Sequence, residues 1–430
     1  MDKLKSGDYV EVFLIKRSYK GILLENSGDD KGVLILKLDS GYNIGLIKKD
    51  ILEVKLIKKF SEKEEKIEIK KSKEKPNVAM IITGGTISAK LNQKKGGVDW
   101  LDTPESLFKF YPEIFEKINL INVEVPFMKA SEDMDFKEWK KIAKIAEKFL
   151  NNENIKGIII TQGTDFLHYT SAALSFFLRN LNKPVVLTYS QRSIDRASSD
   201  AKLNLQCSAL ASISDIAEVM IVGHATTNDD FCYAIPGTKT RKMHSSRRDA
   251  FKIINSKAFA KIFSDRVEIV SNYKKRDNKK RVKLDAKFEE KVALVKIYPG
   301  QDPEILNYFL KKKYKGIILE MSGLGHAPTK RARKSWTKKL KEVQGKGLIV
   351  CATAQTIYGR LDPWVYSNGR ELLKTGIIYL EDMLSETALV KLSWVLGHGE
   401  WAKDKDIVKE KMLKNFAHEI NDRLEIDFDF

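Results

Sequence analysis

The run Val78-Ala79-Met80-Ile81-Ile82 leads directly into Thr83-Gly84-Gly85-Thr86-Ile87-Ser88. A short, continuous apolar run that ends in turn residues is typical of a strand buried on both faces of a sheet. A similar run occurs at 157–161, and apolar residues recur at helical spacing over 136–149 and 170–181. Apolar strands that alternate with amphipathic helices predict a parallel α/β sheet.

The composition of the chain changes at two places, which predicts three domains. Residues 8–56 hold short apolar stretches split by Gly, Asp and Asn turns, as in a small SH3- or Sm-like β-barrel. We therefore expect an α/β fold with a two-domain core of parallel sheets and helices, preceded by this barrel. The expected bounds are 1–57 for the barrel, 58–75 for a charged linker, 76–271 for the larger α/β domain, 272–290 for a connector and 291–430 for the smaller α/β domain.

The charge balance of the 430 residues is basic. Lys and Arg total 76 against 58 Asp and Glu, which gives a formal net charge of +18 and a pI near 9.4. Such a surface attracts polyanions, including nucleic acids, at long range. Lys/Glu-rich chains are also common where no such ligand exists, so charge alone leaves both interpretations open.

No apolar run approaches the roughly 20 residues of a spanning helix, and Met1–Val10 holds no apolar core of the signal-peptide kind. We expect a cytoplasmic protein. The three cysteines, Cys207, Cys232 and Cys351, are widely spaced. This spacing favours reduced structural thiols over a disulfide framework or a zinc site.

Two expected strand ends carry the groups for a chemical site. One strand leads into Thr83–Ser88 and another into Thr161-Gln162-Gly163-Thr164-Asp165. Open α/β sheets bind ligands beyond the carboxyl ends of their strands, and glycines there present free N–H groups to an oxyanion. Either motif alone is usually ordinary turn chemistry. Together, with a carboxylate at Asp165 that we expect to be buried, they predict one site.

A threonine hydroxyl is a poor nucleophile and needs a nearby base. A carboxylate is too weakly basic to serve alone, whereas a lysine can accept the proton when burial lowers its pKa. The candidate is Lys242, in the stretch Thr238–Ser246. Because lysine is abundant in this chain, spacing alone does not single it out.

The motifs resemble those of the asparaginase family over residues 76–430. The two family signatures match Thr83–Ile87 and Thr161–Asp165. The downstream matches are Arg192–Leu205, Gln355–Arg360 and Tyr366–Gly369. The resemblance implies an asparaginase-like two-domain core.

The resemblance also implies roles for individual residues. Thr86 is the expected first nucleophile, and Thr164, Asp165 and Lys242 are the expected relay that activates a hydroxyl. Ser131 and Glu132 match the segment that binds the α-amino and α-carboxylate groups of the substrate. Gly85 and Gly163 are expected to border the substrate, with backbone N–H groups near Gly85 and Thr164 at the oxyanion. Two attacks through an acyl-enzyme then release ammonia and the acid.

The chain departs from the family at two places. Gln162 stands where many members have histidine, a change that we expect to be tolerated. The stretch Asn92–Gly97 has no tyrosine, although many members have one there, near the nucleophile. The resemblance therefore does not imply activation of Thr86 by a tyrosine from this stretch.

A barrel ahead of the core, with Ser131-Glu132-Asp133-Met134 in the substrate segment, resembles the tRNA-dependent amidotransferase branch of the family. That branch implies ammonia release from glutamine or asparagine for a partner, the E subunit of the amidotransferase. The partner uses ATP and Mg²⁺ to convert Glu-tRNA(Gln) to Gln-tRNA(Gln). The implied assembly is a homodimer with two partner subunits, forming a heterotetramer, and this chain itself needs no cofactor or metal.

Two other functions remain open from the sequence. One is a free-standing L-asparaginase with an accessory barrel, which would hydrolyse asparagine at full rate without a partner. The other is an RNA-binding protein on an inactive scaffold, against which the intact Thr86, Thr164, Asp165 and Lys242 argue. The cluster Lys330–Lys334 with Trp336, which we interpret either as an RNA contact or as a solvated helix face, does not decide between them.

Overall fold

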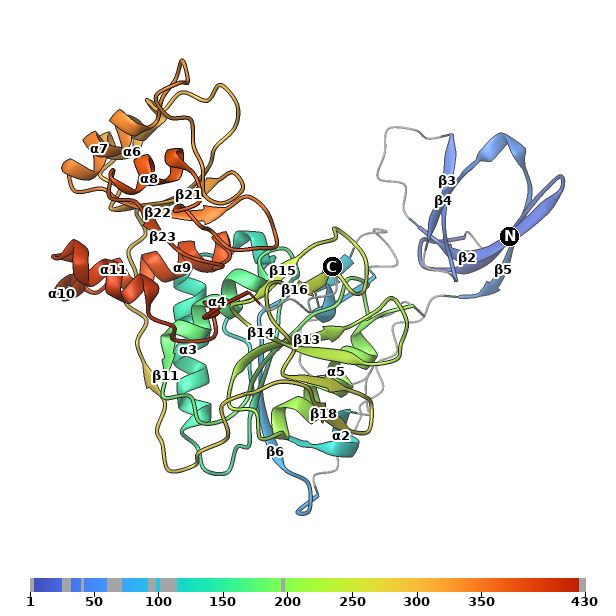
Figure 1. Ribbon diagram of the computed structural model, residues 1–430. Helices are drawn as coiled ribbons and strands as arrows, with labels where there is room; N and C mark the ends of the chain where they lie inside the picture. Colours follow the sequence, from blue (N-terminus) through green and yellow to red (C-terminus); the bar gives the residue numbers. More distant parts are fainter. Residues whose placement is uncertain are drawn as a thin grey trace.

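The computed structural model describes residues 4–24, 32–39, 42–59, 72–91, 98–100, 114–194 and 198–424. Its first part is a five-stranded antiparallel sheet in the order β4-β3-β2-β1-β5. Alternate side chains of a strand face the same side, and Val10, Val12, Leu36 and Leu46 form the small core. The sheet forms a separate lobe (Figure 1). Its elements are β1 (Tyr9–Leu14), β2 (Arg17–Leu23), β3 (Val33–Leu38), β4 (Asn43–Ile47), η1 (Lys48–Asp50) and β5 (Ile51–Lys58).

The second part is built on an eight-stranded sheet in the order β18-β17-β14-β13-β12-β10-β6-β9. Strands β9, β6, β10, β12 and β13 are parallel, so their carboxyl ends lie at one edge. The strands are β6 (Asn77–Ile82), β9 (Asn119–Glu124), β10 (Ile158–Thr161), β12 (Val185–Thr188), β13 (Val219–His224), β14 (Cys232–Pro236), β17 (Ala260–Ile262) and β18 (Val267–Ile269).

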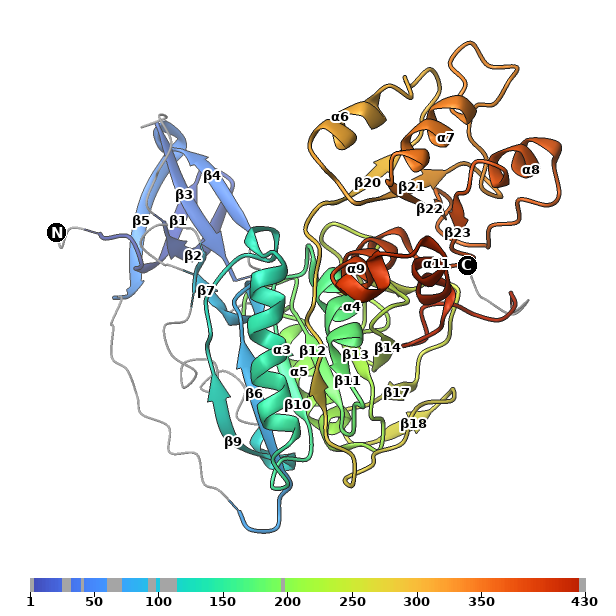
Figure 2. The same ribbon diagram turned by 90° about the vertical axis from the view of Figure 1, so that its left-hand side faces the viewer.

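Helices cover both faces of this sheet, because alternate strand residues are apolar on both sides. Ile158 and Ile160 pack with the helices α3 (Phe136–Leu150) and α4 (Leu167–Phe177), and Ile159 packs with α5 (Ala201–Ile213). Figure 2 shows α3 and α4 in front of the sheet. Helix α3 begins with a capping box, in which Asp135 and Glu138 each accept a backbone N–H. The sheet therefore lies between two helical layers.

Short elements complete this domain. They are η2 (Thr86–Ser88), β7 (Ala89–Leu91), β8 (Val98–Trp100), α2 (Ile114–Lys117), η3 (Ser131–Asp133), β11 (Leu178–Arg179), β15 (Thr240–Lys242), β16 (Phe251–Ile253) and β19 (Lys283–Leu284). Strands β15 and β16 pair as an antiparallel hairpin.

The third part is a four-stranded parallel sheet in the order β20-β21-β22-β23. Helix α9 (Ser385–Leu396) lies between this sheet and α4, where Trp394 stacks on Phe176 with ring centroids 5.6 Å apart. The two α/β domains therefore share one hydrophobic core. The remaining elements are β20 (Val292–Lys296), α6 (Ile305–Lys311), β21 (Gly316–Met321), α7 (Thr337–Gly345), β22 (Ile349–Ala354), α8 (Ser367–Leu373), β23 (Ile378–Tyr379), α10 (Gly399–Ala402) and α11 (Lys405–Leu413).

The structure confirms the α/β class and corrects two details. The larger sheet is not wholly parallel, because residues 225–231 connect β13 to β14 as a hairpin, which requires antiparallel strands. The helix expected over 170–181 starts at Leu167 and ends at Phe177. It ends there because Leu178 and Arg179 pair with Lys283 and Leu284 instead.

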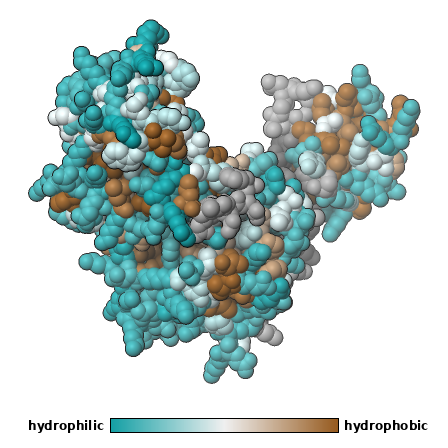
Figure 3. Space-filling model, in the orientation of Figure 1, coloured by the Kyte–Doolittle hydropathy of each residue, from teal (hydrophilic) through white to brown (hydrophobic). Residues whose placement is uncertain are grey.

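The visible face of the molecule is mostly hydrophilic, with apolar patches on the small lobe and on the larger domain (Figure 3). Ile15, Tyr42 and Leu52 are exposed on the small lobe. All three cysteines are buried and unbonded to one another, as reduced structural thiols require. Among the residues that the structure describes, every helix is too short or too polar to span a membrane.

Candidate active site

Two glycine turns meet at the carboxyl edge of the large sheet. Strands β6 and β10 are neighbours, with Ile82 paired to Thr161, so the turns that follow them lie side by side. A Cβ atom on Gly85 would lie 2.2 Å from the backbone nitrogen of Gly163, which means that the two backbones touch. Gly85 has a φ of +82°, a conformation that favours glycine. Thr86 and Thr164, the residues that follow these glycines, are therefore brought to one place.

Hydrogen bonds hold this edge together. The backbone N–H and the hydroxyl of Thr83 both donate to the carbonyl of Thr161, at 3.1 and 2.9 Å. Thr83 in turn accepts the backbone N–H of Lys129 at 2.9 Å, which ties in the segment that leads to η3. Three chain segments of the expected site are thus fixed to one another.

The expected substrate segment, with Ser131 and Glu132, packs against the turn that contains Gly163. A Cβ on Gly163 would lie 3.2 Å from the hydroxyl oxygen of Ser131. Ser131 is buried and accepts the backbone N–H of Phe166 at 3.2 Å, whereas Glu132 is exposed. The structure therefore brings Gly85, Gly163 and Ser131 together and leaves the Glu132 carboxylate accessible to a solute.

Lys242 reaches this edge from the β15–β16 hairpin. Its Nζ donates to Oγ1 of Thr164 at 2.8 Å and to Oδ1 of Asp165 at 2.8 Å. The Lys242 side chain is 10% exposed, but the Asp165 side chain is 59% exposed. The expectation of a buried Asp165 carboxylate is wrong, because Asp165 begins the turn before α4 on the solvent side of the edge. The pairing of lysine, hydroxyl and carboxylate is nevertheless present.

Thr86 begins the short helix η2 and is partly exposed. The tyrosine-free stretch Asn92–Gly97 lies outside the described residues, as do positions 195–197 of the motif Arg192–Leu205.

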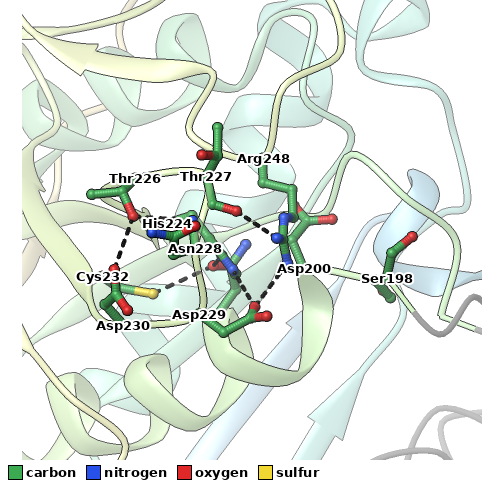
Figure 4. A network of polar contacts seen from close by, with 12 residues as sticks. Ser198, Asp200, His224, Thr226, Thr227, Asn228, Asp229, Asp230, Cys232 and Arg248 are labelled. Atoms are coloured by element: carbon green, nitrogen blue, oxygen red, sulfur yellow. Dashed lines mark hydrogen bonds and ion pairs between the residues drawn. The ribbon is translucent and has the colours of Figure 1, made fainter.

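A polar network at the end of β13 holds the tip of the β15–β16 hairpin (Figure 4). The ring of His224 lies at the end of β13, with Nδ1 2.6 Å from Oδ1 of Asn204 and Nε2 2.9 Å from Oδ1 of Asp229. Arg248, between β15 and β16, donates to the same Asp229 oxygen at 2.9 Å and also to the carbonyl of Thr227. Burial by itself would raise the pKa of Asp229, but the hydrogen bonds from His224 and Arg248 lower it below its ordinary value. The network fixes the tip of the hairpin to the end of β13.

His168 is the histidine beside the site. Burial, together with the positive charges of Arg241 and Lys242, lowers the pKa of His168 to about 3. The ring is therefore neutral at ordinary pH, and it packs on Tyr169 and Phe251. His244, which follows Lys242 by two residues, is exposed and accepts two backbone N–H groups of its own turn.

The smaller domain has a polar cavity of about 470 Å³ lined by His326, Lys330, Arg331, Tyr366, Ser367 and Asn368. Trp336 does not lie on the surface with Lys330 and Arg331, because it is fully buried in the core of the smaller domain. The sequence interpretation that groups Trp336 with the exposed Lys330–Lys334 cluster is therefore wrong.

Family models match three parts of the chain. Residues 77–275 match the model described as asparaginase, N-terminal, and residues 291–410 match that of the glutaminase/asparaginase C-terminal domain. Residues 4–57 match the GatD N-terminal domain. Each match coincides with one of the three parts of the fold.

Among solved structures, the chain is similar to the thermostable L-asparaginase from Thermococcus kodakarensis. The TM-score is 0.70 at 27% identity, covering 81% of this chain and 100% of the other. L-asparaginase I from Vibrio cholerae aligns with a TM-score of 0.67 at 26% identity, over 81% of this chain and 99% of that one. In both alignments about a fifth of this chain has no counterpart.

Curated relatives extend over the whole chain. The D subunit of glutamyl-tRNA(Gln) amidotransferase from Pyrococcus furiosus is 45% identical, over 97% of this chain and 95% of its own. Proteins of the same name from Sulfolobus acidocaldarius and Methanothermobacter thermautotrophicus are 41% and 39% identical, over 97% and 98% of this chain and 92% and 95% of their own. With these matches along nearly its full length, the chain belongs to the family of glutamyl-tRNA(Gln) amidotransferase D subunits, which is built on the asparaginase fold.

Proposed function

We propose that Thr86 attacks the side-chain amide carbon of glutamine or asparagine, and that this chain thereby acts as the amide-hydrolysing subunit of a tRNA-dependent amidotransferase. One observation carries the proposal. Lys242 donates to both Thr164 and Asp165 directly beside the turn in which Gly85, and hence Thr86, meets Gly163. A hydroxyl nucleophile, a base and backbone N–H donors around one carbonyl are what acyl transfer requires.

The reaction proceeds in two attacks. Lys242 takes the proton of the Thr164 hydroxyl as Thr164 takes the proton of the attacking hydroxyl. In the first attack the Oγ1 of Thr86 bonds to the amide carbon and the C–N bond breaks. The leaving nitrogen takes the proton that Lys242 received through Thr164 and departs as ammonia. In the second attack a water oxygen bonds to the acyl carbon, and its proton passes through Thr164 to Lys242. The ester bond to Thr86 then breaks, the Thr86 oxygen takes that proton back, and the acid is released. Asp165 holds the Lys242 amine toward Thr164.

The substrate's amino-acid end binds beside the two turns. The Glu132 carboxylate pairs with the α-ammonium group, and the Ser131 hydroxyl contacts the α-carboxylate. Backbone N–H groups near Gly85 and Thr164 stabilise the oxyanion, while Gly163 leaves room for the substrate. Donors already in place at the developing charge need no reorganisation during the reaction.

The ammonia passes to a partner, the E subunit of the amidotransferase, which uses ATP and Mg²⁺ to convert Glu-tRNA(Gln) to Gln-tRNA(Gln) in the cytoplasm. This chain forms the homodimeric centre of a heterotetramer and binds no cofactor itself. The formal net charge of +18 supports a tRNA substrate, because basic surfaces add affinity for phosphates without sequence preference.

The test is to measure ammonia release from glutamine and from asparagine, first by the isolated chain and then with the E subunit, ATP, Mg²⁺ and Glu-tRNA(Gln). We expect slow hydrolysis by the isolated chain and a strong acceleration in the complete mixture. Full-rate asparagine hydrolysis by the isolated chain, unchanged by the additions, would instead identify a free-standing L-asparaginase. Absence of hydrolysis in every mixture would leave an inactive scaffold.

A further inference from the structure

The side chains of strand β15 and of the residue before it contact both α/β domains. Successive side chains of a strand point to opposite sides, and the residues 239–242 follow this alternation. Lys239 and Arg241 point to the smaller α/β domain, where they meet Asp382 at 2.6 Å and Glu386 at 3.2 Å. Lys242 points the other way, to Thr164. The backbone that carries Lys242 is therefore attached to the smaller domain immediately on its other side.

The Lys239–Asp382 and Arg241–Glu386 ion pairs differ in burial and in the bonds around them. Lys239 and Asp382 are both fully buried, and Asp382 also accepts hydrogen bonds from Asn421. Thr387 on α9 adds a hydrogen bond to the carbonyl of Thr238 at 2.8 Å. These contacts already join the domains, so Arg241 and Glu386 are not needed merely for joining them.

The buried Glu386 carboxylate depends on Arg241 for charge compensation. The Glu386 side chain is 9% exposed, and its Oε2 has no hydrogen-bond partner among the described residues. Burial raises the pKa of Glu386, Arg241 opposes that rise, and the nearby Glu320 adds to it. A buried carboxylate that loses its cation is strongly destabilised, so Glu386 holds the Arg241 guanidinium at a defined place on α9.

We propose that Arg241 and Glu386 are positioning residues that place Lys242 for proton exchange with Thr164. The inference rests on the role proposed for Lys242 above. A three-residue strand paired to another three-residue strand gives little rigidity by itself, and the lysine side chain adds several rotatable bonds. Anchoring the residue next to Lys242 to a helix in the shared core limits the positions that the amine reaches.

The test compares variants of the full chain by ammonia release, under whichever condition gives the wild type its higher rate. In Glu386→Gln and in Arg241→Gln, kcat should fall by roughly 10- to 100-fold, the range expected for a misplacement of about 1 Å. KM should stay within about threefold, because the expected substrate contacts at Ser131 and Glu132 lie on other segments. Arg241→Lys keeps a cation at this place and should recover most of the lost kcat.

The double variant Arg241→Gln/Glu386→Gln keeps the test decisive if a single variant unfolds. It removes both charges and leaves no unpaired buried charge, so it should fold. Its kcat should be reduced to about that of the worse single variant and no further, because the two residues act as one unit. Arg266→Gln is the control: Arg266 pairs with Glu268 at 2.8 Å beside β18, away from both β15 and α9, so kcat should not change.

A double variant that folds with wild-type kcat would overturn the inference, and so would an equal loss of kcat in Arg266→Gln. Lys242→Met separates this failure from a failure of the proposed function. If Lys242→Met is inactive while the double variant is fully active, the positioning role alone is wrong. If Lys242→Met itself remains active, the proposed mechanism is wrong, and the positioning role with it.

Discussion

The amine nitrogen of Lys242 lies 2.8 Å from the hydroxyl oxygen of Thr164. The two residues come from a hairpin and from a strand-to-helix turn, and the contact leaves the hydroxyl within proton-transfer range. Replacing Lys242 by methionine keeps a straight side chain and removes the amine. We expect ammonia release to fall by about 10²- to 10⁴-fold, the usual contribution of a general acid or base.

Thermal unfolding of Lys242→Met should change little, because an ion pair whose partner is as exposed as Asp165 contributes little stability. Lys252→Met is the control in the same hairpin. Lys252 pairs with Asp249, which Arg247 also holds, so its loss should leave the rate near that of the wild type. Equal losses in both variants would contradict a specific role for Lys242.

Thr86→Val removes the proposed nucleophile and nearly preserves side-chain shape. Hydrolysis should fall by several orders of magnitude, as is usual when one member of a coupled catalytic unit is lost. Thr86→Ser retains a hydroxyl and should keep measurable activity with a covalent intermediate. If Thr86→Val keeps most of its activity, the nucleophile lies elsewhere, and Thr164 becomes the next candidate.

Gly85→Ala should affect both stability and activity. The φ of +82° disfavours alanine by about 1–2 kcal/mol, and the added Cβ would meet the Gly163 backbone at 2.2 Å. Overpacking of this kind adds about 1–3 kcal/mol. Gly300→Ala is the control, since Gly300 has a similar φ of +79° with nothing within 4 Å of the added atom.

Urea unfolding of the two glycine variants measures the difference. Gly300→Ala should show only the backbone effect and full activity. Gly85→Ala should lose more stability and most of its activity, because Gly163 must move away and take Thr164 with it. Similar unfolding midpoints for the two variants would mean that the two turns are not in tight contact.

His168 should make stability depend on pH. The pKa of its ring is about 3 in the folded protein, against an ordinary value of 6.5. Between these values the unfolded chain binds a proton that the folded chain does not, so stability falls as pH falls through this range. The slope should approach about 1.4 kcal/mol per pH unit for this one group.

The free energy of unfolding, measured at pH 7 and pH 4.5, should fall less in His168→Leu than in the wild type. If wild type and His168→Leu lose equal stability between the two pH values, the His168 ring is not kept neutral by its surroundings.

Several features could be predicted from the sequence because they depend on neighbouring residues. The apolar runs before Thr83 and Thr161 predicted buried strands, and the glycines after them predicted turns; both are present. The helix over 136–149 was predicted within one residue of α3. The predicted end of the helix after Asp165 was wrong. That end depends on the pairing of β11 with β19, which lies more than a hundred residues further on.

The sequence by itself determined the strands, the glycine turns at their carboxyl ends and the hydroxyls that follow, because local sterics and apolar periodicity act over a few residues. Residue spacing left open which of many lysines meets Thr164; the family resemblance indicated Lys242, and the tertiary structure places its amine there, 78 positions away. The tertiary structure alone decided that Asp165 is exposed. It also decided that Glu386 of the smaller domain anchors the residue beside Lys242. Such contacts depend on strand crossovers and on the packing of α9 against α4, and these are properties of the whole chain.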